Sequence, residues 1–163
     1  MRHDETQGGA LIIFATFLVG LILSQIPLPD FLMWYRPEWV ALVLIYWVMM
    51  VPHQVGLISA FSMGLLLDVI RGSVLGLNAL SLTIITYLVL LLYKRLRMFP
   101  LWQQSMMVMV LVGINQLLFF WMQGITGTTA AGLQFLIPSL ISGLFWPWIY
   151  VVLHGVRKTF RIE

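Results

Sequence analysis

The stretch Gly64-Leu-Leu-Leu-Asp68-Val-Ile-Arg71-Gly72-Ser-Val-Leu-Gly76 decides the fold, because it places one carboxylate and several glycines within an apolar run. The other acidic residues lie near the ends of the chain or beside the Pro-rich segment 27–37. An ionisable group inside an apolar body is costly and is by default a candidate functional residue. Asp68 also has a structural interpretation, since it can cap a broken helix or pair with Arg71.

Small residues recur at every fourth position around Asp68, namely Gly56, Ala60, Gly64, Gly72 and Gly76. Each step of four residues turns about 40° around a helix, so three consecutive positions can face one neighbouring helix but six cannot. A single helix over residues 55–93 would be about 58 Å long, whereas the hydrocarbon core of a bilayer is about 30 Å thick. We therefore expect the first three positions to form a packing face and Gly72 and Gly76 to form a turn. Asp68 then lies just below the membrane surface.

The composition is that of an integral membrane protein. Charged residues make up 9% of the chain and hydrophobic residues 61%, whereas a globular domain has about 25% charged residues. The length of 163 residues suits one transmembrane domain over the whole chain. The net charge of +3 comes from basic residues in short segments between apolar runs, which indicates membrane orientation and no nucleic-acid partner. The chain has no cysteine, which excludes disulfides and thiolate chemistry.

The apolar runs and their interruptions predict an all-α bundle of six transmembrane helices. The expected spans lie at about 9–26, 38–51, 55–71, 77–93, 101–123 and 133–153. Pro52-His53-Gln54 divides the long run at 39–70, which as one helix would be about 48 Å long. The resulting second and third spans are at or below the usual length, so a re-entrant or tilted geometry is an alternative.

Lysine and arginine predict the orientation. With six spans, seven basic residues share the side of the two termini: Arg2, Lys94, Arg95, Arg97, Arg157, Lys158 and Arg161. Arg36 and Arg71 lie on the other side. The positive-inside rule therefore places both termini in the cytoplasm.

The polar residues of the spans do not form a recognisable catalytic pattern. His53 and His154 are isolated from one another in the sequence, and one carboxylate lies inside the body, so we expect no enzyme, metal or cofactor. Asn115 is more typical of a contact between helices than of a binding site. Trp146 shares one face of the last span with Ser139, Ser142 and Gly143, and Pro147 predicts a kink there.

Several short motifs together suggest a family. They are Arg36-Pro37-Glu-Trp39, Tyr46-Trp47, Pro52-His53, Gly64-x3-Asp68-x3-Gly72-Ser-x2-Gly76, Leu101-Trp-Gln-Gln104, and Trp146-Pro147-Trp148 before a basic tail. In this order they resemble the rod shape-determining membrane proteins of the MreD family in its Gram-negative form. The resemblance covers nearly the whole chain.

The resemblance implies a subunit of the bacterial cell-elongation (rod shape) complex in the inner membrane. Its implied partners are the bitopic protein MreC, the actin-like MreB filament, and RodA with its penicillin-binding protein. The family is also similar in fold to the substrate-binding subunits of energy-coupling-factor transporters. It has no established catalytic residues to carry over.

The leading hypothesis is a non-enzymatic membrane scaffold, surrounded by membrane lipids, that docks MreC and links MreB to peptidoglycan synthesis. The alternative is a binding or transport subunit for a small solute or lipid, with a pocket near Asp68. An intramembrane enzyme would need a second polar residue facing Asp68. The candidate structural or partner-contact residues are Arg36, Pro37, Gly64, Asp68, Arg71, Gly72, Gly76, Asn115, Trp146 and Pro147.

Overall fold

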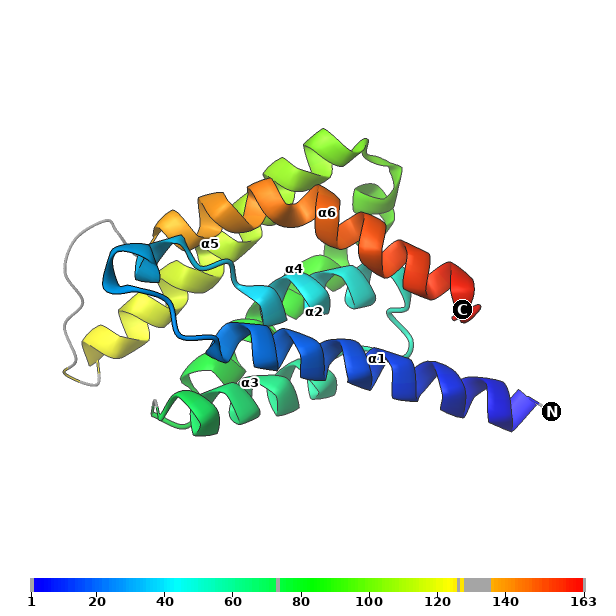
Figure 1. Ribbon diagram of the computed structural model, residues 1–163, viewed down its shortest axis with the longest axis horizontal. Helices are drawn as coiled ribbons and strands as arrows, with labels where there is room; N and C mark the ends of the chain where they lie inside the picture. Colours follow the sequence, from blue (N-terminus) through cyan, green and yellow to red (C-terminus); the bar gives the residue numbers. More distant parts are fainter. Residues whose placement is uncertain (1, 73, 126, 128–135, 163) are drawn as a thin grey trace.

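The computed structural model describes residues 2–72, 74–125, 127 and 136–162, and all regular structure within these ranges is helical. The helices are α1 (Arg2–Gln25), α2 (Trp39–Met50), α3 (Leu57–Arg71), α4 (Leu77–Met98), α5 (Leu101–Ile125) and α6 (Ile137–Thr159), with a short 3-10 helix, η1 (Asp30–Tyr35), before α2 (Figure 1). The prediction of six α-helices is confirmed for the described residues.

The limits of three helices differ by more than two residues from the expected spans, and one of them is α6, which ends at Thr159 where the last span was expected to end at about 153. α1 starts at Arg2, within the polar segment that precedes the apolar run. α4 continues to Met98, so the basic segment 94–97, expected as a loop, forms the last turn of the helix. Basic side chains are favourable there because the carbonyl end of a helix carries a partial negative charge. The expected start of the last span, residues 133–135, lies outside the described residues.

Helix α2 forms the centre of the molecule. Its sequence has no polar face, and every residue from Val40 to Met50 is buried. A helix that is apolar on all sides is stable only when other helices surround it. α1, α4, α5 and α6 all contact α2, which lies between them in Figure 1.

The carboxyl end of α2 is held by an arginine from another helix. Arg97, in the last turn of α4, donates from Nε to the Met49 carbonyl oxygen at 2.7 Å and from Nη2 to the Met50 carbonyl oxygen at 2.6 Å. The last carbonyl groups of a helix have no partner within that helix. Arg97 therefore satisfies two carbonyl acceptors at the end of α2, because the apolar side chains around this helix offer no hydrogen-bond donors to them.

Within the described part of the chain, four helices are long and apolar enough to cross a membrane: residues Gln7–Gln25 of α1, and the whole of α4, α5 and α6. α2 has 12 residues and α3 has 15, or about 18 Å and 22 Å at 1.5 Å per residue. The long helices also expose large apolar side chains, for example Leu11, Trp121 and Leu144 at 61–70%. An outer surface of this kind is adapted to lipid, and the protein is a membrane protein.

Both termini lie at one end of the bundle, and η1 and the turn between α3 and α4 lie at the other (Figure 1). Consecutive helices thus run in opposite directions between these two ends. The short helices α2 and α3 run between the same two ends as the long ones. We refer below to the terminal end and the η1 end.

Helices α3 and α4 pack backbone to backbone at Gly64. A Cβ atom added at Gly64 would lie 2.2 Å from the Ala79 Cα atom and 2.5 Å from the Ala79 nitrogen. These distances are far below van der Waals contact, so only glycine fits. Small residues allow helices in membranes to approach closely, and here the approach places the start of α4 beside Asp68.

We predict that Gly64→Ala lowers the free energy of unfolding by about 1–3 kcal/mol, because the new methyl group overpacks the contact with Ala79. Gly155→Ala is the matched control, since Gly155 is also helical and an added Cβ meets nothing within 4 Å. The control should be neutral or more stable by up to about 1 kcal/mol. Thermal unfolding in detergent measures both, and equal melting temperatures would contradict the close approach.

Candidate functional site

The Asp68 carboxylate forms the cap of a neighbouring helix. Asp68 is fully buried. Its Oδ2 accepts the Gly76 N–H at 2.9 Å and the Ala79 N–H at 3.4 Å, and its Oδ1 accepts the Asn78 N–H at 3.1 Å and the Asn78 side-chain Nδ2 at 2.9 Å. The first N–H groups of a helix lack partners and carry a partial positive charge. Asp68 of α3 therefore satisfies the start of α4, which is the geometry of a cap.

Two glycines shape the turn that brings α4 back to Asp68. Gly72 has φ +67° at the end of α3, and Gly76 has φ +101° just before α4. Residues with a Cβ atom rarely adopt either conformation, because Cβ then approaches the backbone too closely. Both are turn glycines, and they allow the chain to reverse over a few residues.

A second carboxylate, Glu38, lies within the bundle at the η1 end. Its Oε1 accepts the Gln116 Nε2 at 2.8 Å, its Oε2 lies 3.6 Å from Arg71 Nη2, and its backbone N–H donates to the Ser142 hydroxyl at 2.9 Å. These partners belong to α5, α3 and α6, and the Glu38 and Arg71 side chains are 16% and 26% exposed. Glu38 thus joins four helices at the residue that precedes α2.

From the sequence, Glu38 was expected beside the Pro-rich segment 27–37, and Asp68 was considered as the partner of Arg71. The ion pair of Arg71 in the structure is with Glu38. A sequence signal did exist: Glu38 immediately precedes a helix that is apolar on all sides. The start of such a helix is buried, so the polar residue at its cap position is buried with it.

Arg36 holds the end of α1. Its guanidinium donates to the carbonyl oxygen of Ser24 at 2.6 Å and also to that of Ile26. A cation at the carbonyl end of a helix is favourable for the same reason as Arg97 at the end of α2. Pro37 is buried beside it, between Arg36 and the start of α2.

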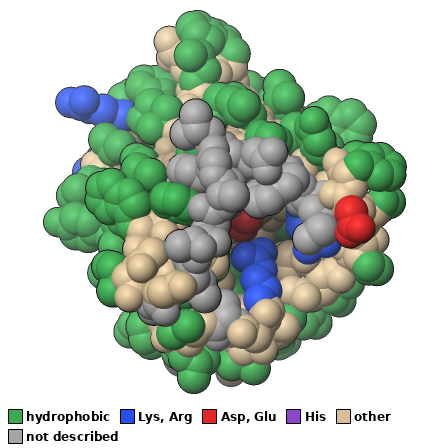
Figure 2. Space-filling model, turned by 90° about the vertical axis from the view of Figure 1, so that its left-hand side faces the viewer, with side chains coloured by type: hydrophobic (Ala, Val, Ile, Leu, Met, Phe, Trp, Pro, Cys, Tyr) green, Lys and Arg blue, Asp and Glu red, His purple; other side chains and the backbone are tan. Residues whose placement is uncertain are grey.

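Asn115 lies next to Gln116 on α5 and is 4% exposed. Its Oδ1 has no hydrogen-bond partner among the described residues. Figure 2, which views the η1 end, shows basic and acidic side chains near the middle of this end and hydrophobic side chains toward its periphery. Glu38 brings Arg71 and Gln116 together at this end, while Arg36 and Asp68 satisfy helix ends there through separate contacts.

Trp146 and Pro147 lie away from this region. Trp146 is fully buried, and its indole N–H donates to Gln104 Oε1 at 3.3 Å. The Gln104 Nε2 donates to the carbonyl oxygen of Leu96, at the end of α4, at 2.8 Å. Trp146 thus stabilises the turn between α4 and α5. Pro147 lies inside α6, and Figure 1 shows α6 bending along its length.

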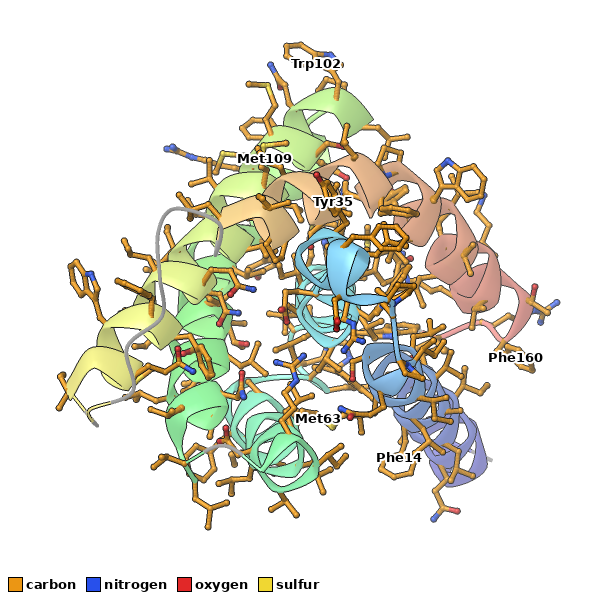
Figure 3. All side chains as sticks on the ribbon, turned by 60° about the vertical axis from the view of Figure 1, so that its left-hand side comes forward. Phe14, Tyr35, Met63, Trp102, Met109 and Phe160 are labelled. Atoms are coloured by element: carbon orange, nitrogen blue, oxygen red, sulfur yellow. The ribbon has the colours of Figure 1, made fainter. Side chains whose placement is uncertain are left out.

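Apolar grooves flank α1 on two sides. The α1–α3 groove has a volume of about 340 Å³ and is lined by Ala10, Ile13, Phe14, Phe17, Gln54, Val55, Ile58, Ser59, Ser62, Met63 and Leu66. Figure 3 shows Phe14 on α1 and Met63 on α3 near one another. The α1–α6 groove has a volume of about 420 Å³. Asp68 lines neither groove, so this geometry does not favour a solute pocket around its carboxylate.

We predict that Asp68→Asn destabilises the fold by about 1–2 kcal/mol, because an amide keeps one acceptor oxygen but turns an NH2 group toward backbone donors. Asp68→Ala removes both acceptors and should destabilise it more. Asp30→Asn is the control, since it removes an exposed carboxylate from the same end. Thermal unfolding in detergent measures the order of stability of the three variants. An Asp68→Asn variant as stable as the control would contradict the capping role.

The chain matches known proteins over nearly its whole length. Residues 5–156 match the family described as rod shape-determining protein MreD. The chain is 33% identical over 151 residues to the rod shape-determining protein MreD of Haemophilus influenzae, and this region covers 93% of each chain. No solved structure matches significantly, so the similarity to energy-coupling-factor transporter subunits stays a prediction. The chain belongs to the MreD family of rod shape-determining membrane proteins.

Proposed function

We propose that this protein is a non-enzymatic scaffold of the cell-elongation complex in the bacterial inner membrane. In this proposal it docks the transmembrane helix of MreC, and it links the MreB filament to the synthesis of peptidoglycan by RodA and its penicillin-binding protein. Membership of a family that determines rod shape carries the proposal. The partners themselves come from what the family resemblance implies.

The described polar side chains support a structural role. Asp68, Arg36 and Arg97 each hold the end of a helix, and Glu38 joins four helices. Groups held in this way have their hydrogen-bonding capacity directed to the protein backbone or to one another. This arrangement favours a scaffold whose contacts with partners lie on its apolar faces.

The α1–α3 groove is the face that we propose for MreC. α1 packs mainly against α2, which leaves its side toward α3 accessible. A shallower groove continues this seam with Leu18, Leu21, Ile22, Gln25, Ile26, Pro27 and Ile70. The seam therefore follows residues 10–25 of α1, about 24 Å, and continues past the end of the helix to Pro27, so that its length approaches the core thickness of about 30 Å. Its small and hydroxyl residues Ala10, Ser59 and Ser62 suit helix–helix packing.

We predict that Ser59→Phe combined with Ser62→Phe fills this groove and lowers the co-purification of MreC from detergent at least tenfold. Val151→Phe is the control, because Val151 is 62% exposed on α6 and lies outside the groove. The control should recover MreC as the unchanged protein does. In cells lacking their own copy, the double variant should yield rounded cells and the control rods. Full recovery of MreC by the double variant would remove this groove from the proposal.

The proposed topology places the terminal end in the cytoplasm. Because the chain has no cysteine, a single introduced cysteine reports the side of the membrane on which it lies. Lys94→Cys and His53→Cys should react with a membrane-impermeant maleimide only after the inner membrane is opened, whereas Asp30→Cys should react before. Reaction of His53→Cys from the outside would show that α2 and α3 do not cross together.

A further inference from the structure

Helix α1 extends past the end of α2, the helix that supports it. The two helices are antiparallel, and two contacts set their register. The Trp47 indole N–H donates to Thr16 Oγ1 at 2.8 Å. A Cβ on Gly20 would lie 3.6 Å from Val43 Cγ2. About one turn beyond the first of these contacts α2 ends, so residues 2–12 of α1, about 16 Å of helix, have no α2 beside them.

Residues 160–162, which we call the C-terminal strap, lie against this part of α1. Ile162 is 4% exposed and belongs to the continuous apolar core of the bundle. A Cβ on Gly9 would lie 3.7 Å from Ile162 Cγ2 and 3.8 Å from its Cγ1, so the Ile162 side chain covers Gly9, which is buried. The strap therefore supplies apolar packing to α1 beyond the end of α2.

Hydrogen bonds from α6 hold the strap in place. The chain turns after α6 at Arg161, whose φ of +49° is uncommon for a residue with a Cβ atom. The Ile162 N–H donates to the Arg157 carbonyl oxygen at 3.1 Å, and Arg157 Nε donates to the Ile162 carbonyl oxygen at 3.2 Å. Arg157 Nη1 also lies 3.6 Å from Met50 Sδ at the end of α2. Arg157 thus ties the strap to the ends of two helices.

The grooves on both flanks of α1 leave it room to tilt. The α1–α6 groove lies on one side of α1, and Phe160 of the strap lines it. The α1–α3 groove lies on the other side, and Ala10, Ile13 and Phe14 line it. Ala10 directly follows Gly9, the residue that the strap covers. The part of α1 that the strap holds is therefore continuous with a wall of the groove that we propose for MreC.

We propose that the C-terminal strap is a conformational device that sets the tilt of α1 and, with it, the width of the α1–α3 groove. While Ile162 covers Gly9, α1 stays against the core and the groove keeps the shape that a partner helix fills. When the strap is released, α1 pivots about its contact with Trp47, and one wall of the groove moves. Small shifts of a packed helix of this kind are a common switching motion. The identity of the partner helix rests on the proposed function, whereas the tilt of α1 does not.

Double electron–electron resonance on the full chain in detergent tests the tilt of α1. Because the chain has no cysteine, spin labels on Gln7→Cys and Met98→Cys report the distance between exposed positions of α1 and α4. Gln7 lies about 14 Å along α1 from Thr16, so a tilt of about 20° moves it by about 5 Å. We expect Ile162→Ser to shift or broaden the measured distance by about this amount. Ile162→Val keeps the apolar contact and should leave the distance unchanged.

A second labelled pair, Met98→Cys with Val151→Cys on α6, is the control. Val151 is 62% exposed, and the pair does not include α1, so its distance should stay the same in every variant. An α1 distance that is unchanged in Ile162→Ser would overturn the strap. A change in both pairs would show a general loss of packing and would overturn it as well.

Co-purification of MreC from detergent tests the role of the strap in docking. Ile162→Ser should lower the recovery of MreC roughly tenfold, and Ile162→Val should keep it. Full recovery of MreC by Ile162→Ser, with α1 displaced, would overturn the role in docking. If the unchanged protein recovers no MreC, the proposed function fails, and the distance measurement still decides whether the strap sets the tilt of α1.

Discussion

The structure depends on how the ends of short helices are satisfied inside an apolar bundle. The first N–H and last carbonyl groups of any helix lack partners within it, and a bilayer core offers no water to replace them. α2 has 12 residues and is buried along its whole length, so its ends cannot reach the membrane surface on their own. Arg97 of α4 supplies donors to one end, and Glu38 at the other end is tied to α3, α5 and α6. The same requirement explains why Asp68 accepts hydrogen bonds from the start of α4 and why Arg36 donates to carbonyl groups at the end of α1.

These caps also hold the helices to one another, because nearly every capping side chain comes from a different element than the end it satisfies. Removing one would leave several backbone groups unpaired at low dielectric, where an unmade hydrogen bond is most costly. α1 is the exception in its packing, since it rests mainly on α2 and keeps a groove on either side. The ends of the interior helices are therefore fixed by polar contacts, and α1 keeps an apolar groove on either side.

The sequence was sufficient for the helices and for the turn at Gly72 and Gly76, because both follow from the thickness of a bilayer. An apolar run that would be longer than the bilayer as one helix must be divided, whichever helices it packs against. Pro52 marks one of these divisions. The role of Glu38 could not be derived in this way. Its contacts with Gln116 and Ser142 join positions 78 and 104 residues apart, and no local pattern connects them. The end of α4 was also expected too early, because a basic segment after an apolar run is typical of a loop. The contact of Arg97 with the end of α2 is not visible in the sequence.

The two ends of the bundle differ in the number of their basic residues, and they also differ in the contacts that these basic side chains make. At the η1 end, Arg36 donates to the carbonyl groups that end α1, and Arg71 pairs with Glu38. At the terminal end, Lys94, Arg95, Lys158 and Arg161 are exposed. Positive charge that is already paired attracts anionic lipid weakly, because the field of each cation is offset by its neighbour. Among the described basic side chains, the exposed cation of the η1 end, Arg71, is therefore paired with Glu38, and the other exposed cations lie at the terminal end.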